Sequence, residues 1–169
     1  MEYYLNNFKT NYRNSLNSEG IFWLHEITNK DWSIDSFIIE RFNNNYEFFK
    51  LKQKYDYIQN LHITITNKND FPIQEKYKNT SHYSLSINFD KNLYKLWDIL
   101  TNAFLINSDL FNKKELLYGI SYSCKKEHII IKLLYKTSDE LDNVFNINSN
   151  DYKKYLQNSN FNLKYRFVK

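Results

Sequence analysis

Residues 21–42 read IFWLHEITNKDWSIDSFIIERF, and the arrangement of the whole chain follows from this stretch. Two runs rich in Ile, Phe and Trp flank a polar segment at 25–31. Both runs have the β-branched and aromatic composition of strands, and Asn, Asp and Ser bound them. The stretch therefore predicts a β-hairpin with strands at 21–26 and 33–42. Trp32 lies at the end of the loop between the two strands, where a large indole can be partly buried while its N–H stays solvated.

Length and composition limit the class of protein. A chain of 169 residues suits one domain, which we expect over residues 16–169 behind a polar arm at 1–15. Two glycines exclude a glycine-rich phosphate loop. The single cysteine, Cys124, excludes an internal disulfide and agrees with a reducing compartment. No apolar run approaches the roughly 20 residues that span a bilayer, so we expect a soluble cytoplasmic protein. A net charge of +4 is compatible with an anionic ligand.

Hydrophobic periodicity predicts the remaining elements. An Asn cluster caps a helix expected at 45–57, and KNLYKLWDILTNAFLIN at 91–107 carries the strongest apolar helical stripe. Shorter helices are expected at 138–145 and 149–157, with Ser138 and either Ser149 or Asn150 as caps. Alternating or apolar runs predict five more strands, at 61–66, 83–89, 115–123, 127–136 and 162–168.

The order of these elements indicates an α+β domain. Strands follow one another directly in pairs, which argues for a mainly antiparallel sheet, and helices inserted between pairs pack on one face. We therefore expect a curved sheet of about seven strands backed on its convex face by about three helices. The other face is then free for a ligand.

Several short motifs occur together along the chain in a recognisable order. They are FW at 22–23, Trp32, EFF at 47–49, PIQE at 72–75, LW at 96–97, YGISYS at 118–123, a basic turn at 125–126 and YRFV at 165–168. In order and spacing they resemble the eukaryotic translation initiation factor 4E family, which binds the methylated guanosine cap of messenger RNA. The resemblance covers about residues 16–169. The Asn, Lys, Ile and Tyr bias is typical of an AT-rich genome, which suggests a divergent viral or parasite member, acting in the host cytoplasm if viral.

The resemblance implies how the cap is recognised. In the family the methylated guanine, a delocalised cation, stacks between two tryptophans, while a glutamate accepts hydrogen bonds from its Watson–Crick edge. Trp32 matches the first tryptophan and Glu75 matches the glutamate. Gln74 stands at the position of the second tryptophan; its amide can lie flat on a base but lacks the polarisable face of a ring. Either one indole therefore holds the cap with weaker affinity, or a neighbouring ring, Phe71 or Tyr77, is the second plate. The resemblance implies no cofactor and no metal.

Basic residues are expected to hold the cap phosphates. Lys125 matches a family arginine, and Lys126 is adjacent to it. On the strand at 127–136, alternation puts His128 and Lys132 on the face opposite the longer apolar set, so either residue can replace the family's strand lysine. Lysine in place of arginine forfeits a bidentate phosphate contact.

The resemblance also implies a partner-binding back face for a scaffold of the initiation factor 4G type. The corresponding residues here are Leu16, Phe49, Trp97 and Asp98. Trp97 lies in the apolar stripe, so packing is its expected role, as it is for Trp23, Tyr83 and Phe49. The back face carries polar residues where the family has apolar ones, which favours a dedicated partner, or none, over the usual scaffold.

Two other functions fit parts of the sequence. A curved sheet with aromatic and basic residues also suits a cap-independent binder of single-stranded RNA. His62-Ile-Thr and His82-Tyr-Ser fit the motif of two-histidine RNA cyclic phosphodiesterases, although only 20 residues separate them. The histidines show no metal-ligand spacing, and Cys124 has no identifiable catalytic partner. The sequence favours a non-enzymatic cap-binding protein that acts in translation initiation or its control.

Overall fold

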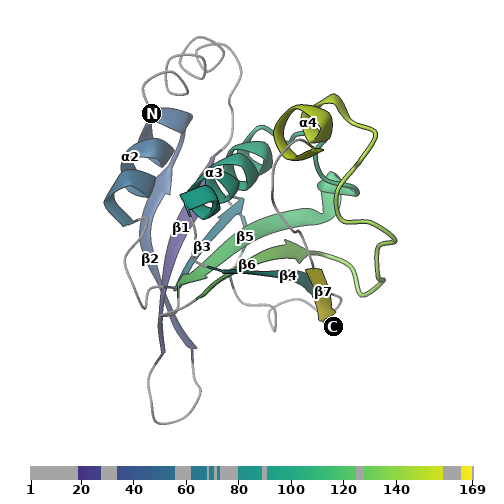
Figure 1. Ribbon diagram of the computed structural model, residues 1–169. Helices are drawn as coiled ribbons and strands as arrows, with labels where there is room; N and C mark the ends of the chain where they lie inside the picture. The colour runs from purple at the N-terminus through teal and green to yellow at the C-terminus, as the bar shows by residue number, and fades with distance from the viewer. Residues whose placement is uncertain are drawn as a thin grey trace.

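A seven-stranded sheet forms the frame of the described molecule, and every strand pairing in it is antiparallel (Figure 1). The strands lie in the order β2-β1-β3-β5-β6-β4-β7. Their bounds are Gly20–Ile27 (β1), Ile34–Phe42 (β2), His62–Asn67 (β3), Ser81–Asn88 (β4), Leu117–Cys124 (β5), His128–Tyr135 (β6) and Tyr165–Val168 (β7). The computed structural model describes residues 19–27, 34–55, 62–67, 69–70, 72, 80–88, 91–124, 128–157 and 165–168.

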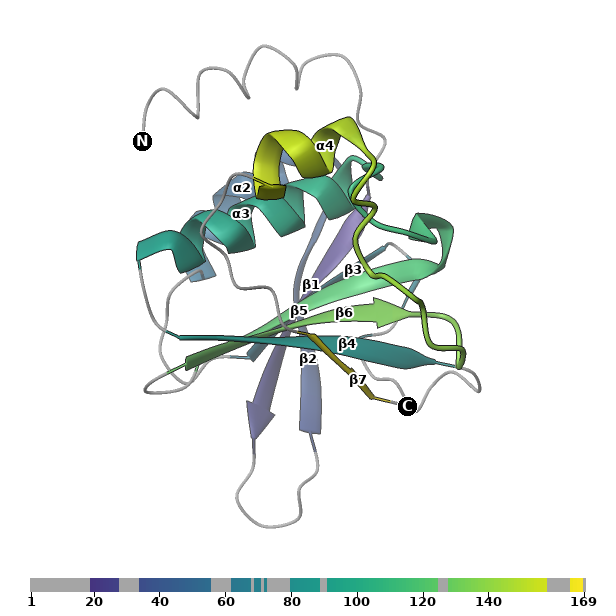
Figure 2. The ribbon, with the colours of Figure 1, turned by 45° about the vertical axis from the view of Figure 1, so that its right-hand side comes forward.

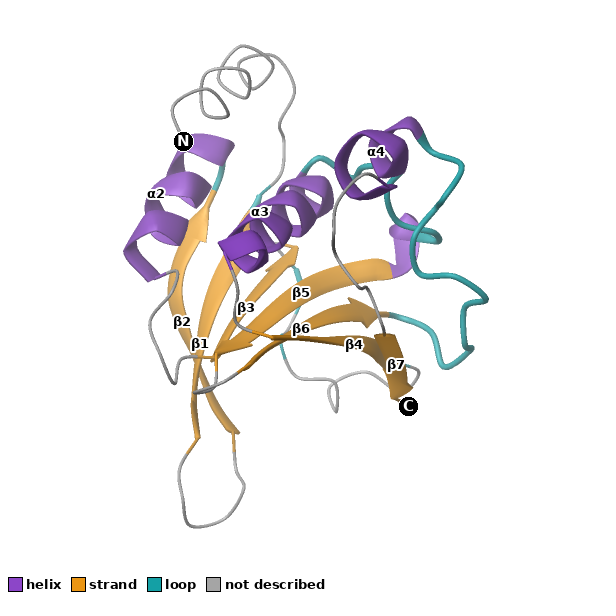
Figure 3. Ribbon diagram, viewed as in Figure 1, coloured by secondary structure: helices purple, strands orange, loops and turns teal. Residues whose placement is uncertain are grey.

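The described helices lie on one side of the sheet. They are α2 (Asn45–Tyr55), α3 (Lys91–Leu105) and α4 (Asn150–Tyr152), which the π-helical turn η3 (Lys153–Gln157) continues; a 3-10 turn, η2 (Lys114–Leu116), leads into β5. Figures 2 and 3 show α2, α3 and α4 over the same side of the strands. We name this side the helical face, and the opposite side, over which no described helix lies, the open face. None of the described helices is long and apolar enough to cross a membrane.

Strand alternation decides which side chains enter the core. The β6 residues of one parity, Ile129, Ile131, Leu133 and Tyr135, are buried in one cluster with the apolar side chains of α3. Lys132 has the other parity and faces away from this cluster, as the sequence predicts. The expected α+β architecture, a sheet backed by helices on one side, is confirmed.

Two of the predicted helix caps form, while Ser138 caps no helix. Asn44 begins α2, because its side-chain oxygen accepts the N–H of Glu47 at 3.0 Å. Ser149 begins α4 in the same way and accepts the N–H of Tyr152 at 3.0 Å. The apolar stripe of α3 is buried as expected at Leu96, Trp97, Leu100, Phe104 and Leu105.

The segment 138–145 is irregular, so the prediction of a helix there is wrong. Contacts from distant parts of the chain hold its backbone instead. The N–H of Leu141 donates to the hydroxyl of Tyr83 at 2.5 Å, and Phe145 forms an isolated antiparallel bridge with Phe111. These tertiary contacts override the weak local preference that the sequence pattern expresses.

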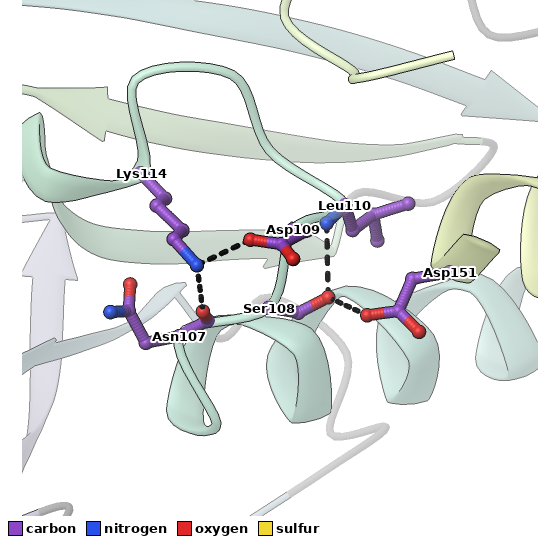
Figure 4. A network of polar contacts seen from close by, with 6 residues as sticks. All are labelled: Asn107, Ser108, Asp109, Leu110, Lys114 and Asp151. Atoms are coloured by element: carbon purple, nitrogen blue, oxygen red, sulfur yellow. Dashed lines mark hydrogen bonds and ion pairs between the residues drawn. The ribbon is translucent and has the colours of Figure 1, made fainter. Parts of the chain in front are cut away.

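Polar contacts around Ser108 tie α4 to the end of α3 (Figure 4). The Ser108 hydroxyl donates to the carboxylate of Asp151, the second residue of α4. Next to it, Lys114 Nζ donates to the carbonyl of Asn107 at 2.9 Å and to the Asp109 carboxylate at 2.5 Å. These contacts connect α4 and η2 to the segment that follows α3, on the helical face.

Candidate ligand-binding face

A row of polar side chains crosses the open face. The strand register sets Thr64 of β3, Ser121 of β5, Lys132 of β6, Ser84 of β4 and Arg166 of β7 directly opposite one another. We name these five residues the polar row. Thr64 and Ser121 are 1% and 2% exposed, Lys132 and Ser84 are half-buried, and Arg166 is exposed. The side chains of the row are therefore buried at β3 and become accessible to solvent towards the β7 edge.

Two histidines stack beside the buried end of the polar row. His25 of β1 and His62 of β3 are partners in the strand register, and their ring centroids are 4.4 Å apart. The Nε2 atom of His25 is hydrogen-bonded to the Thr64 hydroxyl, and that of His62 to the Ser121 hydroxyl, each at 2.8 Å. Two hydroxyls of the row thus fix the orientation of both imidazoles.

Burial keeps the open-face histidines uncharged at neutral pH. Burial, together with a smaller repulsion from Lys132, lowers the pKa of His25 and that of His82 to about 4. Burial also lowers the pKa of His62 to about 3, with added repulsion from His25 and then Lys132. The positive charge of the polar row at pH 7 is therefore that of Lys132 and Arg166.

A second group of contacts ties the connection between β3 and β4 to the open face. Trp23 Nε1 donates to the Thr66 hydroxyl at 2.9 Å, and that hydroxyl donates to the carbonyl of Asp70 at 3.0 Å. The Asp70 carboxylate is paired with Lys136, whose Nζ lies 5.7 Å from the centre of the Tyr118 ring. We name Trp23, Thr66, Asp70, Tyr118 and Lys136 the root cluster. Trp23 is thus buried on the open face, outside the main core.

Most of the predicted cap contacts lie outside the described residues. These are Trp32, Phe71, Gln74, Glu75, Tyr77, Lys125 and Lys126. For His128 the structure describes the backbone, which begins β6 opposite Asn88. The side chain of Lys132 is described, and it lies on the predicted face in the middle of the polar row.

The structure does not bring His62 and His82 together as an acid–base pair. Both lie on the open face, but β5 and β6 separate their strands. At about 4.8 Å between neighbours, β3 and β4 are roughly 14 Å apart. Strand register adds an offset of four residues, roughly 13 Å, along the strands. This separation is too large for both imidazoles to act on one phosphate, so the geometry does not support the phosphodiesterase hypothesis.

An ion pair joins α2 to α3 on the helical face. Lys52 is only 4% exposed, yet it pairs with Asp98, and its Nζ lies 5.9 Å from the centre of the Trp97 ring. Trp97 is 1% exposed, so the indole offers a partner no surface, in contrast to its place in the predicted partner-binding set. Phe49 is half-buried against the core, and Leu16 lies outside the described residues.

Sequence reasoning missed the histidine pair and its hydroxyl partners, although part of the signal is visible. Alternation in HITIT puts His62 and Thr64 on the face opposite Ile63 and Ile65. Alternation does not tell which strands are neighbours, however. The contact of His25 with His62 depends on β1 lying beside β3, which only the sheet order reveals.

Several solved structures share this fold. Ascaris suum eIF4E-3 in complex with the m7G cap has a TM-score of 0.59 and 15% identity, over 73% of each chain. Schistosome eIF4E in complex with m7GpppG and 4E-BP has a TM-score of 0.60 and 15% identity, over 74% of this chain and 73% of that one. C. elegans eIF4E-3, in a complex with the 4E-binding protein Mextli and a cap analog, has a TM-score of 0.57 and 15% identity, over 73% and 74%.

Comparison at the level of sequence gives no match. No protein-family model matches the chain, and no curated protein sequence does either. At 15% identity the likeness to the solved structures concerns the arrangement of strands and helices. This protein has the fold of the eIF4E cap-binding proteins.

Proposed function

We propose that this protein binds the 7-methylguanosine 5′ cap of messenger RNA and acts in translation initiation or its control. The observation that carries the proposal is the likeness of its fold to proteins whose structures contain a cap or cap analog. A polar open face, free of described helices, is a surface on which such a ligand can lie. Recognition of a cap requires no bond to break, so the proposed role is that of a binding protein and not of an enzyme.

Trp32 and Glu75 are the proposed readers of the base. The methylated guanine is a cation, and an indole face attracts it through stacking and cation–π interaction, with stacking worth about 1–3 kcal/mol per base. The Glu75 carboxylate accepts hydrogen bonds from N1–H and the exocyclic amine, a pattern that guanine supplies. The second plate is the amide of Gln74 or the ring of Phe71 or Tyr77.

The root cluster, whose residues the structure describes, supports this assignment. It fixes Asp70, which stands five residues before Glu75 in the sequence, through an ion pair and a hydrogen bond to its carbonyl. A segment that carries base-reading residues has to be held at a defined distance from the sheet, because a small misplacement weakens a directional hydrogen bond.

The cap phosphates are assigned to Lys125, Lys126, His128 and Lys132. Lys132 has the best described environment, since it is half-buried with Ser121 and Ser84 opposite it on the neighbouring strands. A partly desolvated ammonium with hydroxyl groups nearby suits phosphate oxygens, because hydrogen bonds between ionised groups are the stronger ones. His128 begins the same strand, and Lys125 and Lys126 precede it in the sequence.

A protein partner on the helical face is the second part of the proposal. Relatives in fold were solved with 4E-BP or Mextli bound. In this chain the half-exposed carboxylate of Asp98, paired with the buried Lys52, lies between α2 and α3. We therefore assign this face, with Phe49 and Asp98, to a dedicated scaffold of the initiation factor 4G type that carries polar groups to match.

Calorimetric titration with m7GTP, GTP and m7GpppA tests the function. We expect the wild type to bind m7GTP at least about tenfold more tightly than GTP, and Trp32→Ala and Glu75→Gln each to lose about tenfold or more, equal to 1.4 kcal/mol. Calorimetry is preferred to tryptophan fluorescence, because Trp32→Ala removes one of three indoles in the chain. Glu115→Gln, which neutralises an exposed carboxylate on η2, is the matched control.

Equal affinity for GTP and m7GTP would contradict cap recognition. That result would favour the second candidate, a single-stranded RNA binder without cap preference. Its support is the polar row itself, in which hydroxyls and cations span five strands and Gln74 replaces an aromatic plate in the sequence.

A further inference from the structure

The accessible half of the polar row has the chemistry of a phosphate-binding strip. Lys132, Ser84 and Arg166 lie opposite one another on β6, β4 and β7, the last three strands of the sheet. The first two are half-buried, and Arg166 is exposed at the sheet edge. A hydroxyl thus lies between two cations on a face without described helices.

Charge within the strip is permanent at neutral pH. His82, two residues before Ser84 on the same face, is uncharged because burial lowers its pKa to about 4. The cations of the strip are therefore Lys132 and Arg166. The sequence adds Lys164 and Lys169 on either side of β7. Affinity for an anion on this strip is expected to depend on salt and not on pH near neutrality.

The spacing of the strip allows its two cations to contact different phosphate groups. Lys132 and Arg166 are separated by β4, which at about 4.8 Å per strand sets their backbones roughly 10 Å apart. One phosphate can contact Lys132 while another, farther along an extended strand, contacts Arg166. The Ser84 hydroxyl between them can donate to the intervening sugar–phosphate backbone.

We propose that Lys132, Ser84 and Arg166 bind the phosphodiester backbone of the RNA nucleotides that follow the cap, and lead the strand across β4 to the β7 edge. The proposal rests on the proposed function for its starting point, since Lys132 is also assigned to the cap phosphates. Contacts to phosphate and sugar carry no base information, so the strip binds RNA of any sequence.

Salt-dependent binding of a short capped RNA tests the strip. The probes are m7GTP and the oligonucleotide m7GpppA followed by about five uridines, each titrated by calorimetry at several salt concentrations. In the wild type the oligonucleotide binds more tightly than m7GTP, with a steeper salt dependence of about 0.7 in slope for each added phosphate contact. Arg166→Met reduces oligonucleotide affinity about three- to tenfold, more than it reduces m7GTP affinity. It also lowers the slope of the salt dependence by the amount that one phosphate contact contributes.

Control variants separate binding from folding. Lys153→Met removes a cation that is also exposed, from η3 on the helical face, and leaves both affinities unchanged. Arg166→Lys keeps the charge and restores most of the oligonucleotide affinity. Far-UV circular dichroism and thermal unfolding verify that each variant is folded, since β7 is an edge strand.

The outcomes distinguish this inference from the proposed function. If m7GTP binds but the added nucleotides bring no gain, or Arg166→Met changes both ligands equally, the strip does not bind RNA and cap recognition stands. If m7GTP does not bind while the oligonucleotide binds and its affinity depends on Arg166, cap recognition fails and the strip is supported. If Arg166→Met only promotes self-association, the arginine protects the sheet edge and the inference is overturned.

Discussion

At the scale of single residues, the His25–His62 pair is the most unusual feature of the open face. Two imidazoles in contact would repel each other strongly if both were protonated. The hydroxyls of Thr64 and Ser121 satisfy one nitrogen of each ring. The pair therefore behaves as a neutral, hydrogen-bonded element of the sheet and not as a source of charge.

This arrangement predicts a loss of stability in mild acid. The pKa of His25 is about 4 in the folded protein, below its ordinary value of 6.5, so the unfolded chain binds protons first as the pH falls. The free energy of unfolding is then unaffected above about pH 7 and decreases from about pH 6.5 towards pH 4. For His25 the full difference corresponds to roughly 3 kcal/mol.

Urea unfolding between pH 7.5 and pH 5 measures the effect before carboxylates titrate. His62→Gln removes one titrating group and the repulsion within the pair, so its stability declines less steeply with acid than that of the wild type. Gln53→Asn, at an exposed position of α2, keeps the wild-type slope. Identical slopes for His62→Gln and the wild type would show that the pair does not titrate as described.

Residue-scale features were the hardest to predict from sequence. Alternation correctly predicted on which face of the sheet Lys132 lies, because every second residue of β6 is apolar and those residues are buried in the core. The buried pairing of Lys52 was not predictable, since a lysine on a polar helix such as α2 normally lies in solvent. Its partner Asp98 comes from a helix that is distant in sequence, so only the packing of α2 beside α3 brings them together.

At the scale of elements, the Lys52–Asp98 pair determines how α2 and α3 are joined. Asp98→Leu leaves the buried Lys52 ammonium without this partner, and we expect a loss of roughly 2 kcal/mol, less than for a fully buried pair because the Asp98 side chain is 51% exposed. Adding Lys52→Met to Asp98→Leu restores most of the stability, since an apolar pair of similar size needs no counter-charge. Chemical denaturation of the single and double variants gives the coupling energy.

An exposed ion pair in the same protein serves as the comparison. Lys114 and Asp109 are bonded at 2.5 Å, but Asp109 is 72% exposed. Asp109→Asn is expected to cost less than about 1 kcal/mol, because solvent screens such a pair. If the two pairs proved equally important, burial of Lys52 would not be the reason for the effect at Asp98.

Element-scale prediction from sequence succeeded where periodicity was strong. The long stripe of α3 and the alternating strands were found with boundaries shifted by a few residues. The exception is 138–145, where the backbone of Leu141 is held by Tyr83 from β4. Local patterns cannot anticipate a hydrogen bond between groups 58 positions apart.

At the scale of the whole molecule, the sheet separates two functional surfaces. The root cluster belongs to the open face and the Lys52–Asp98 pair to the helical face. Lys136→Met removes the partner of Asp70, so we expect m7GTP affinity to fall several-fold. The double variant Lys52→Met/Asp98→Leu is expected to keep m7GTP affinity within about twofold, because distant sites with no shared contacts act independently.

Calorimetry on both variants measures this separation, with thermal unfolding as a check on folding. Equal losses of affinity in the two variants would indicate that the faces are coupled through the core. Unchanged affinity in Lys136→Met would mean that the ion pair of Asp70 has no part in ligand binding.

The overall architecture was predictable because β1 and β2, like β5 and β6, are neighbours both in sequence and in the sheet, and because α3 has one apolar stripe. The order of the strands was not, since β4 pairs with β6 and β7 and not with its sequence neighbour β3. That order decides which polar residues meet on the open face, so the polar row could be found only in the folded structure.

The root cluster has a consequence for how new binding preferences can arise. Asp70, after β3, is held by Lys136, and Thr80 and Ser81, at the start of β4, are buried. We therefore expect the sequence between these two anchors to tolerate substitution while the strands keep their register. Introducing tryptophan at position 74 would then alter what the protein selects and not how it folds.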